Sequence, residues 1–483
     1  MKKQNPLNTL SMDRRQWLRW GGASLAGAFG VGGLSALLQN PVRAQANNYR
    51  ALVCVFLYGG NDGQNMVVPT DSTRYNQYAG VRQALALPQS SLVPLTGTDL
   101  GLHPSMAALE PICSARKIAS VVNVGPLFAP LSKTQYLALP DTDPLIPDSL
   151  FSHSDQQIEW ESSSVSPLER TGWGGRATDT LGTTNPVISV GGNGHFGLSS
   201  LGTPLVLPGP GGTFGVENLS GTWNPTVMRR QALDALYQSA NLGSSNQMLG
   251  AFAQQQRIAF DMSARLGTIV RQEPSTTAPS LIDTAFAPLI DAGGNITTDL
   301  GRQLYQVAKL VQERATVQGE RQLFFAQQGG FDTHNEQIAA TVLTGEHARL
   351  MKTLADAMAC FYNAMAAIGM SNNVTLFTQS DFGRTFAPNS SNGTDHAWGN
   401  HHLVMGGAVQ GGVTYGTYPT LVLQGPDDVG DSPWDRQGRW IPTTSVNQYA
   451  ATLLNWFGAT PAQQLTILPN LANFDTKNLG FLG

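Results

Sequence analysis

Acidic, amide and imidazole side chains follow three apolar segments of this chain, at the points where the segments end. The first segment is followed by Asn61 and Asp62, the second by Asp332 and His334, and the third by Asp381. Carboxylates and imidazoles are the ligands that cations such as Zn²⁺ and Mn²⁺ bind in proteins. The pattern therefore indicates a metal or catalytic site assembled from segments that lie far apart in the sequence.

A later loop adds histidines to this set. Asp395-His396 and His401-His402 come just before another apolar segment, and the chain has only 8 histidines in total. The adjacent pair can be one packed and one exposed residue, so at least one of the two is not expected to be a ligand. His402 or His396 is a candidate for stabilising a leaving oxygen. The predicted metal ligands are Asn61, Asp62, Asp332, His334, Asp381 and His396.

Each of these residues also has a simpler interpretation. Asp62 lies in a Gly-Asn-Asp-Gly stretch that can form a turn. Asp332 or Asp395 can cap a helix or turn, and Asp381 can pair with Arg384 three residues later. Their common position at the ends of apolar segments favours a metal or catalytic cluster over separate structural roles.

Two further residues are candidates for handling a substrate. Ser152 lies at the start of a helix predicted within 150–162, where a hydroxyl and backbone N–H groups can meet an anion. A nearby metal can lower the pKa of that hydroxyl, or it can deliver a hydroxide directly as the nucleophile, although a serine at this place is more often an N-cap. Arg384 can bind a non-bridging oxygen through its planar fork, or it can form a structural ion pair with Asp381.

The elements that must position these side chains are strands and helices in alternation. The run 51–57 is apolar on both faces, as in the central strand of a parallel sheet. A helix is expected around 350–365, where apolar residues recur every three or four positions. Further strands are expected at 118–124, 322–326, 374–377 and 403–409. The sequence predicts an α/β fold, with a mostly parallel central sheet, helices on both faces, and a site at the carboxyl ends of the strands.

The middle of the chain has a different composition. Residues 180–235 are rich in Gly, Pro, Thr and Asn, and helical patterning returns over 226–318. We interpret the segment from about 180 to 300 as a loop-rich insertion or cap. The remainder of 47–483 is expected to form a single domain around it.

The N-terminus has the features of a twin-arginine export signal. Arg14-Arg15 is followed by a Gly-rich, mildly apolar stretch over 20–38, and then by Ala44-Gln-Ala46, a small-x-small cleavage pattern. Residues 1–46 are therefore predicted to be a signal peptide that the twin-arginine machinery recognises. The mature protein is expected to be periplasmic or exported, without a stable membrane span. The alternative is that the stretch is kept as an anchor.

Composition excludes some classes of partner and of covalent framework. Charged residues make up 13% of the chain and the net charge is −4, which gives no electrostatic basis for binding nucleic acid. The 3 cysteines are widely spaced and odd in number, so buried thiols are expected rather than a disulfide framework or zinc knuckle. A single bridge between Cys54 and Cys113 is the alternative.

Several motifs resemble one family of bacterial proteins. The stretches that carry the resemblance are 57–63 (LYGGNDG), 102–104 (LHP), Ser152-His153 with Gln156 and Trp160, 330–334 (GFDTH), 380–385 (SDFGRT) and 394–407. They are similar to a family of twin-arginine exported proteins known as domain of unknown function 1501. This family is grouped with the alkaline phosphatase-like superfamily, beside sulfatases and cofactor-independent phosphoglycerate mutases. The resemblance covers about residues 50 to 480.

The resemblance implies a metal-dependent site with up to two ions. By position, the matching residues are Asp332, His334 and His396 for one site, and Asp62 or Asn61 with Asp381 for the other, with Ser152 as the nucleophile. Two features depart from the superfamily pattern. Asp381 is followed by Phe382 where the superfamily usually has a histidine, and Asp332 and His334 are spaced more closely than usual.

The function that follows from residues and resemblance together is an exported, metal-dependent hydrolase of phosphate or sulfate esters. It would use one or two divalent ions (Zn, Mn or Ca) and act on a small anionic ester. An esterase or phosphonate hydrolase on the same scaffold is not separable from it by sequence. The alternative from another class is a non-catalytic binding or assembly protein of the cell envelope, with a degraded metal site.

Overall fold

The computed structural model describes residues 48–215, 219, 223–243, 247–430 and 437–483. The predicted signal peptide, residues 1–46, lies outside the described residues. Residues Tyr49–Gly483 form one compact unit. Among the described helices, none combines the length and the apolar character that crossing a bilayer requires.

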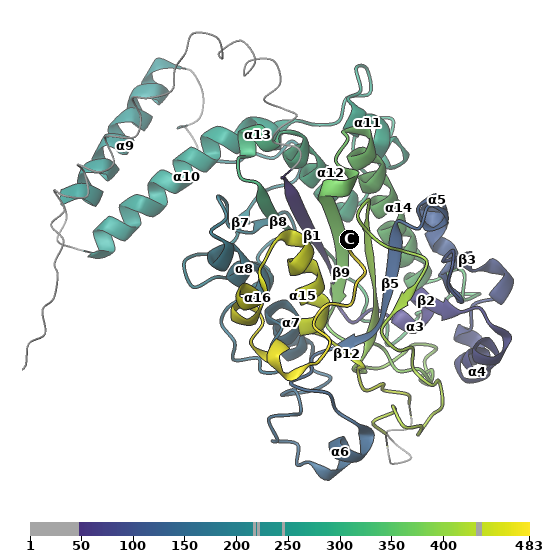
Figure 1. Ribbon diagram of the computed structural model, residues 1–483. Coiled ribbons are helices and arrows are strands. Elements are labelled where there is room, and N and C mark those ends of the chain that lie inside the picture. The colour runs from purple at the N-terminus through teal and green to yellow at the C-terminus, as the bar shows by residue number, and fades with distance from the viewer. Residues whose placement is uncertain (1–47, 216–218, 220–222, 244–246, 431–436) are drawn as a thin grey trace, which may run out of the picture. The chain divides into compact units, whose positions relative to one another are not determined.

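A large sheet forms the centre of this unit (Figure 1). The described strands follow the spatial order β11-β5-β10-β9-β1-β8-β6-β7, and β12 pairs with β5. Their bounds are β11 (Thr414–Tyr415), β5 (Ile118–Gly125), β10 (Asn400–Gly406), β9 (Val374–Ser380), β1 (Arg50–Leu57), β8 (Arg321–Gln328), β6 (Ile188–Ser189), β7 (Leu205–Val206) and β12 (Thr444–Ser445). A small antiparallel sheet stands beside it, formed by β2 (Val67–Pro69), β4 (Leu100–Leu102) and β3 (Val93–Pro94).

The large sheet is mostly parallel. The central strand β1 pairs in parallel with β8 on one side and with β9 on the other. Among the described strands of this sheet, β10 is antiparallel to both of its neighbours, β5 and β9. The predicted α/β class with a mostly parallel sheet is confirmed. The one reversed strand starts at Asn400, so its amino end lies at the same edge as the carboxyl ends of β1, β8 and β9.

Strand β1 shows why its sequence is apolar throughout. Its odd-numbered residues, such as Val53 and Val55, belong to the core on one face of the sheet. Its even-numbered residues, such as Cys54 and Phe56, belong to the core on the other face. Because neighbouring side chains of a strand point to opposite faces, only a continuous apolar run satisfies both cores.

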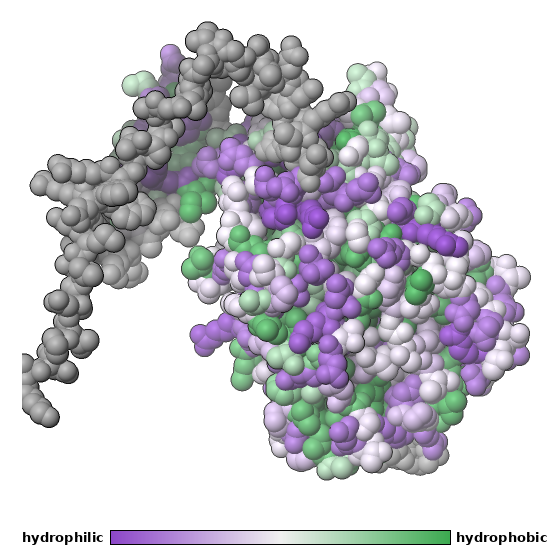
Figure 2. Space-filling model, in the orientation of Figure 1, coloured by the Kyte–Doolittle hydropathy of each residue, from purple (hydrophilic) through white to green (hydrophobic). Residues whose placement is uncertain are grey.

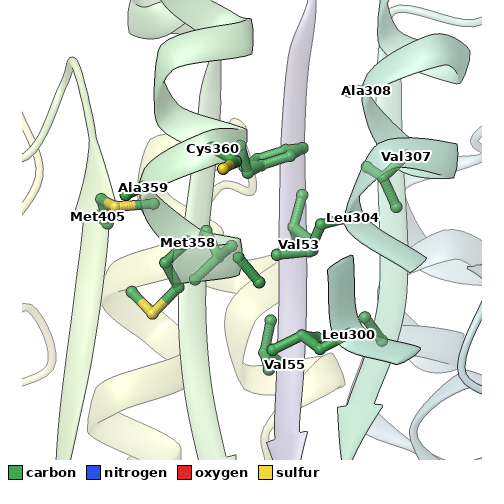
Figure 3. Packing of buried hydrophobic residues seen from close by; sticks show 14 of the residues in the cluster. Val53, Val55, Leu300, Leu304, Val307, Ala308, Met358, Ala359, Cys360 and Met405 are labelled. Carbon is green, nitrogen blue, oxygen red and sulfur yellow. The ribbon is translucent and has the colours of Figure 1, made fainter. Parts of the chain in front are cut away.

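Helices cover both faces of this sheet. Figure 3 shows Leu300, Leu304 and Val307 of α12, and Met358 of α14, packed beside Val53 and Val55 of β1. The opposite face packs against α7, α8, α15 and α16, which Figure 1 shows on the other side. The described helices are α3 (Gly63–Met66), α4 (Ser72–Arg82), α5 (Glu110–Ser114), α6 (Lys133–Ala138), α7 (His153–Ser162), α8 (Trp173–Leu181), α9 (Asn224–Gly243), α10 (Gln247–Arg271), α11 (Leu281–Phe286), α12 (Asp299–Gln312), α13 (Arg314–Val317), α14 (Glu346–Ala367), α15 (Val446–Phe457) and α16 (Pro461–Ile467).

The segment expected as an insertion at about 180–300 takes part in the main sheet. Its short strand β6 pairs with β8, and β7 pairs with β6. The carboxyl-terminal part of α10 also contributes Leu266 and Val270 to the core under α12. Two-residue strands carry too little alternation for sequence to show that they extend the sheet.

The three cysteines are free and buried. Cys54 belongs to the core on one face of the sheet and Cys113 to the core on the other, so the bridge considered between them does not form. On the face drawn in Figure 2, hydrophilic and hydrophobic residues are intermixed over the described part of the chain.

Candidate metal centre

The ends of three parallel strands bring the predicted site segments together. Leu57 of β1 lies level with Gln328 of β8 and with Ser380 of β9. Asp332 therefore follows β8, and Asp381 follows β9, at one edge of the sheet. The loop before β10 reaches the same edge, because Gly383 exchanges backbone hydrogen bonds with Ala397 and Trp398.

Asp332 lies at the centre of a cluster with three histidines. Its Oδ1 is 3.3 Å from Nε2 of His153, 3.2 Å from Nε2 of His334 and 3.5 Å from Nε2 of His396. The Nε2 atoms of His334 and His396 are 2.8 Å apart. Ligand atoms of His153, Asp332 and His396 all lie within 4.8 Å of one another, which is close enough to share one cation.

The other ring nitrogen of each histidine is held by an acceptor. Nδ1 of His153 lies 2.7 Å from Oδ2 of Asp381, and Nδ1 of His334 lies 2.8 Å from Oδ1 of Asp395. Nδ1 of His396 lies 2.6 Å from the carbonyl oxygen of Phe151. A carbonyl oxygen only accepts, so Nδ1 of His396 carries its proton. The two carboxylates place a proton on Nδ1 of the other rings in the same way.

When a ring is neutral with its proton on Nδ1, its Nε2 carries a lone pair, and the Nε2 atoms of all three rings lie 3.2–3.5 Å from Oδ1 of Asp332. Two such lone pairs at the 2.8 Å between His334 and His396 repel each other unless a proton or a cation lies between them. Histidine ligands of metals commonly donate their second N–H to a carboxylate or carbonyl, which fixes the ring orientation. The donor set therefore fits a divalent cation.

Charges around the cluster keep Asp332 ionised. Burial raises the pKa of its carboxyl, but the hydrogen bond and charge of Arg384, together with His153 and His334, lower it to about 2. The hydrogen bond to Asp381 raises the pKa of His153, against the effect of burial. Burial lowers the pKa of His396. The carboxylate is thus ready to bind a cation across the whole neutral range.

Arg384 has a structural position beneath the cluster. It is fully buried, and it donates through Nε to the carbonyl of Gly60 and through Nη1 to that of Thr394. Its Nη2 contacts Asp332 and the carbonyl oxygens of Gly59 and Phe331. With each of its three side-chain nitrogens in a hydrogen bond, Arg384 fixes the ends of β1 and β8 and neutralises Asp332. The oxygen-binding role suggested by sequence stays a prediction.

Phe382 follows Asp381 directly, and it packs against the rings of two candidate ligands. Its ring centroid is 4.6 Å from that of His396 and 4.7 Å from that of His153. Aromatic contacts of this kind limit ring rotation. Phe382 therefore supports two of the imidazoles without contributing a ligand atom.

Asp381 lies next to the cluster but faces the outer side of His153. Its carboxylate accepts from the backbone N–H of Gly59 at 3.1 Å and from Nε2 of Gln157 at 2.8 Å, in addition to His153. The structure thus brings Asp381 to the predicted edge, as an outer partner of a ligand.

The structure places Asp62 and Asn61 in a separate, fully buried network. Asp62 forms an ion pair with Arg82 and accepts a hydrogen bond from Gln337. Asn61 accepts from Nε2 of His347 at 3.2 Å. The guanidinium of Arg82 thus neutralises Asp62, and the ligand role of both residues stays a prediction.

His401 and His402 are both fully buried on β10. The ring of His402 packs 4.7 Å from that of Trp160, and the ring of His401 packs 4.8 Å from that of Tyr418. Burial lowers the pKa of both imidazoles to about 3. Both therefore have packed positions, rather than one packed and one exposed, and the leaving-group role of His402 stays a prediction.

Ser152 occupies the N-cap position of α7, as the simpler interpretation suggested. Its hydroxyl makes no capping bond to the helix and lies 3.2 Å from the hydroxyl of Ser154. The first N–H groups of α7 are therefore not covered by this side chain. Its role as a nucleophile stays a prediction.

The predicted ligand set lacked two residues that the structure places in this site. His153 begins α7, and Asp395 holds His334. Both had a signal in the sequence, since His153 follows Ser152 directly and Asp395 precedes His396. Sequence spacing does not show which of two adjacent polar residues turns toward a site.

The family model described as "Protein of unknown function (DUF1501)" matches residues 138–430 of this chain. The chain belongs to this family. The matched region contains all four candidate ligands, whereas the central strand β1 precedes it. A search of curated proteins finds no match.

Solved structures with some similarity include Ps i-CgsB in complex with k-i-k-neocarrahexaose, with 11% identity, TM-score 0.34, and coverage of 89% of this chain and 77% of that one. A variant of the alkaline phosphatase PafA has 12% identity, TM-score 0.26, and coverage of 69% and 63%. A putative sulfatase from Bacteroides thetaiotaomicron VPI-5482 has 12% identity, TM-score 0.26, and coverage of 87% and 75%. Similarity at this level carries neither the chemistry nor the site, which depend on the geometry above.

Proposed function

We propose that this chain is an exported, metal-dependent hydrolase of phosphate or sulfate esters. One divalent cation would be held by His153, Asp332, His334 and His396. The observation that carries the proposal is the convergence of three Nε2 atoms on one ionised carboxylate, while every Nδ1 is held by an acceptor.

The separations from Asp332 support a four-coordinate ion, whereas the 2.8 Å between Nε2 of His334 and Nε2 of His396 is shorter than such an ion requires. The three distances from Asp332 Oδ1 lie between 3.2 and 3.5 Å. Corners of a tetrahedron with ligands about 2.0 Å from its centre are about 3.3 Å apart, which suits Zn²⁺ with nitrogen and oxygen ligands. The candidate ions remain Zn, Mn and Ca, and the nitrogen-rich ligand set favours a transition metal over calcium.

The cluster is open to a substrate. About half of the Asp332 side chain is exposed (48%), and the three histidine side chains are exposed by 23% to 38%. A bound divalent cation would act as a Lewis acid on an ester oxygen and offset developing negative charge. Asp332 stays ionised beside Arg384, and the uncapped amino end of α7 offers N–H groups to an anionic ester.

The competing proposal is a non-catalytic binding or assembly protein of the cell envelope. It is favoured by the buried ion pair of Asp62 with Arg82, which neutralises a residue expected to bind a second ion. It is also favoured by the hydrogen bonds of all three Arg384 side-chain nitrogens to protein oxygens, since this residue was expected to contact the substrate.

Metal analysis and an activity screen of the purified mature protein test the proposal. We expect about one equivalent of tightly held transition metal. We also expect hydrolysis of at least one member of a panel of phosphate monoesters, phosphate diesters and sulfate esters. Bound metal without hydrolysis of any panel member would favour the binding role. A protein that is stable and binds no metal would overturn the proposal.

A further inference from the structure

Helix α7 supplies more than the ligand His153 at its start. Gln157 lies one turn later, and its Nε2 donates to Oδ2 of Asp381 at 2.8 Å. The same oxygen accepts the Nδ1–H of His153 at 2.7 Å. Because residues four apart lie on one face of a helix, Gln157 and His153 meet the same carboxylate. Gln157 thus fixes the position of the acceptor that orients His153.

Gln156 fixes the residue whose carbonyl accepts the N–H of a second candidate ligand, His396. Its Oε1 accepts the backbone N–H of Phe151 at 2.7 Å, and the Gln156 side chain is fully buried. The carbonyl oxygen of Phe151 in turn lies 2.6 Å from Nδ1 of His396. Two adjacent glutamines of α7 therefore reach two histidines on different segments of the cluster.

The backbone at Phe151 needs such support. Phe151 has φ of +73°, in the left-handed region that is unfavourable for a residue with a side chain. This conformation directs the carbonyl toward His396 while the N–H turns back to Gln156. The hydrogen bond from Gln156 holds a conformation that phenylalanine rarely adopts.

We propose that Gln156 and Gln157 are positioning residues that set two ligand histidines of this site. Gln156 acts as an acceptor through Phe151 on His396, and Gln157 acts as a donor through Asp381 on His153. The inference rests on the metal site of the proposed function, and it does not require hydrolysis.

The test uses the isosteric variants Gln156→Met and Gln157→Met, which keep side-chain length and remove the amide. Gln463→Met is the matched control, since Gln463 Oε1 accepts a backbone N–H at 2.9 Å in the first turn of α16. Zn²⁺ affinity is measured by competition with a chromogenic chelator. We expect each α7 variant to bind Zn²⁺ about 10–100-fold more weakly, as for loss of an outer partner, and the control to match the wild type.

Proton NMR of the metal-free protein separates positioning from general destabilisation. We expect slowly exchanging Nδ1–H signals of His153 and His396 in the wild type. Gln156→Met should lose the His396 signal alone, and Gln157→Met the His153 signal alone. Adding Phe151→Gly, which removes the cost of the left-handed backbone, should restore part of the affinity of Gln156→Met and none of that of Gln157→Met.

Retention of both signals, with affinities within about twofold of the wild type, would overturn the inference. So would loss of both signals in either variant, or rescue of both variants by Phe151→Gly. A wild type that binds none of Zn²⁺, Mn²⁺ and Ca²⁺ would overturn the proposed function, while the paired NMR losses would still decide whether the glutamines set the two rings.

Discussion

Asp332 keeps its negative charge because Arg384 lies against it, although about half of its side chain is exposed. The pKa of about 2 means that protons do not compete for this carboxylate above about pH 4. Competition by protons therefore falls on the histidines. Of the two ligand histidines with a shifted pKa, His153 is more readily protonated, because its hydrogen bond to Asp381 raises its pKa while burial lowers that of His396.

Replacing Asp332 with asparagine should abolish tight metal binding. The asparagine amide is neutral, so the substitution removes the negative charge of residue 332 and leaves the buried Arg384 without its carboxylate partner. We expect Zn²⁺ affinity to fall by more than about 100-fold, which is more than the loss expected when a residue that only hydrogen-bonds to a ligand is removed. Equilibrium dialysis with elemental analysis measures it. The control is Asp291→Asn in an exposed loop, and equal metal content in both variants would contradict the assignment.

Substitution of His153 should change the pH dependence of stability in the metal-free protein. A raised pKa means that His153 stabilises the fold below the unfolded value of about 6.5, and that this contribution is lost as pH rises through the folded pKa. His153→Gln should therefore lower the melting temperature more at about pH 5.5 than at about pH 8.5, as measured by thermal unfolding.

His195→Gln is the control of opposite sign. Burial lowers the pKa of His195, so the wild-type residue becomes unfavourable as pH falls. This variant should lose less stability at the lower pH than at the higher one. The same pH trend in both variants would rule out the assigned role of Asp381.

At the scale of elements, the site depends on how closely the ends of β1 and β8 approach. Gly59 follows β1 with φ of +110°, and a Cβ placed there would lie 2.4 Å from the backbone nitrogen of Asp332. Its own N–H donates to Asp381. A side chain at this position would push two segments of the cluster apart.

Gly59→Ala should therefore weaken both stability and metal binding. Gly192→Ala is the matched control, because Gly192 has φ of +90° but nothing within 4 Å of its added Cβ. Both variants carry the cost of a left-handed alanine, about 1–2 kcal/mol. We expect Gly59→Ala to lower the free energy of unfolding more than the control does. We also expect only Gly59→Ala, and not the control, to bind Zn²⁺ more weakly. Urea unfolding and chelator competition measure the two effects.

Sequence patterns predicted the regular elements better than the short ones. The apolar run of β1, the helix α14 and the start of α7 at Ser152 are all present. The sequence showed strand-like pieces at 186–190 and 204–207 but not that they extend the main sheet, because β6 and β7 have only two residues each. Long elements carry many repeats of their period, whereas short strands depend on partners that are remote in sequence.

For the whole molecule, the candidate ligands tie together segments that are about 240 residues apart in the chain, since His153 and His396 differ by 243 positions. Metal should therefore stabilise the complete unit. A ligand at 100 times its dissociation constant adds about 2.7 kcal/mol to the free energy of unfolding. We expect Zn²⁺ to raise the melting temperature by a few degrees and a chelator to reverse the change.

Asp332→Asn serves as the control for that measurement and should show no response to either addition. An equal rise in the variant would mean that Zn²⁺ acts elsewhere on the protein. Calorimetry on the mature protein, without the predicted signal segment, measures both.

The sequence by itself determined the α/β class, the edge of the sheet where polar residues gather, and the presence there of Asp332, His334, Asp381 and His396. Those features follow from local periodicity and from where each apolar run ends. Only the tertiary structure decided which of these residues face one another. In the structure Asp381 hydrogen-bonds to the outer nitrogen of His153, and Asp62 forms an ion pair with Arg82. Arg384 donates to backbone carbonyls. Side-chain direction and partner choice depend on packing between remote segments, which spacing along the chain does not record.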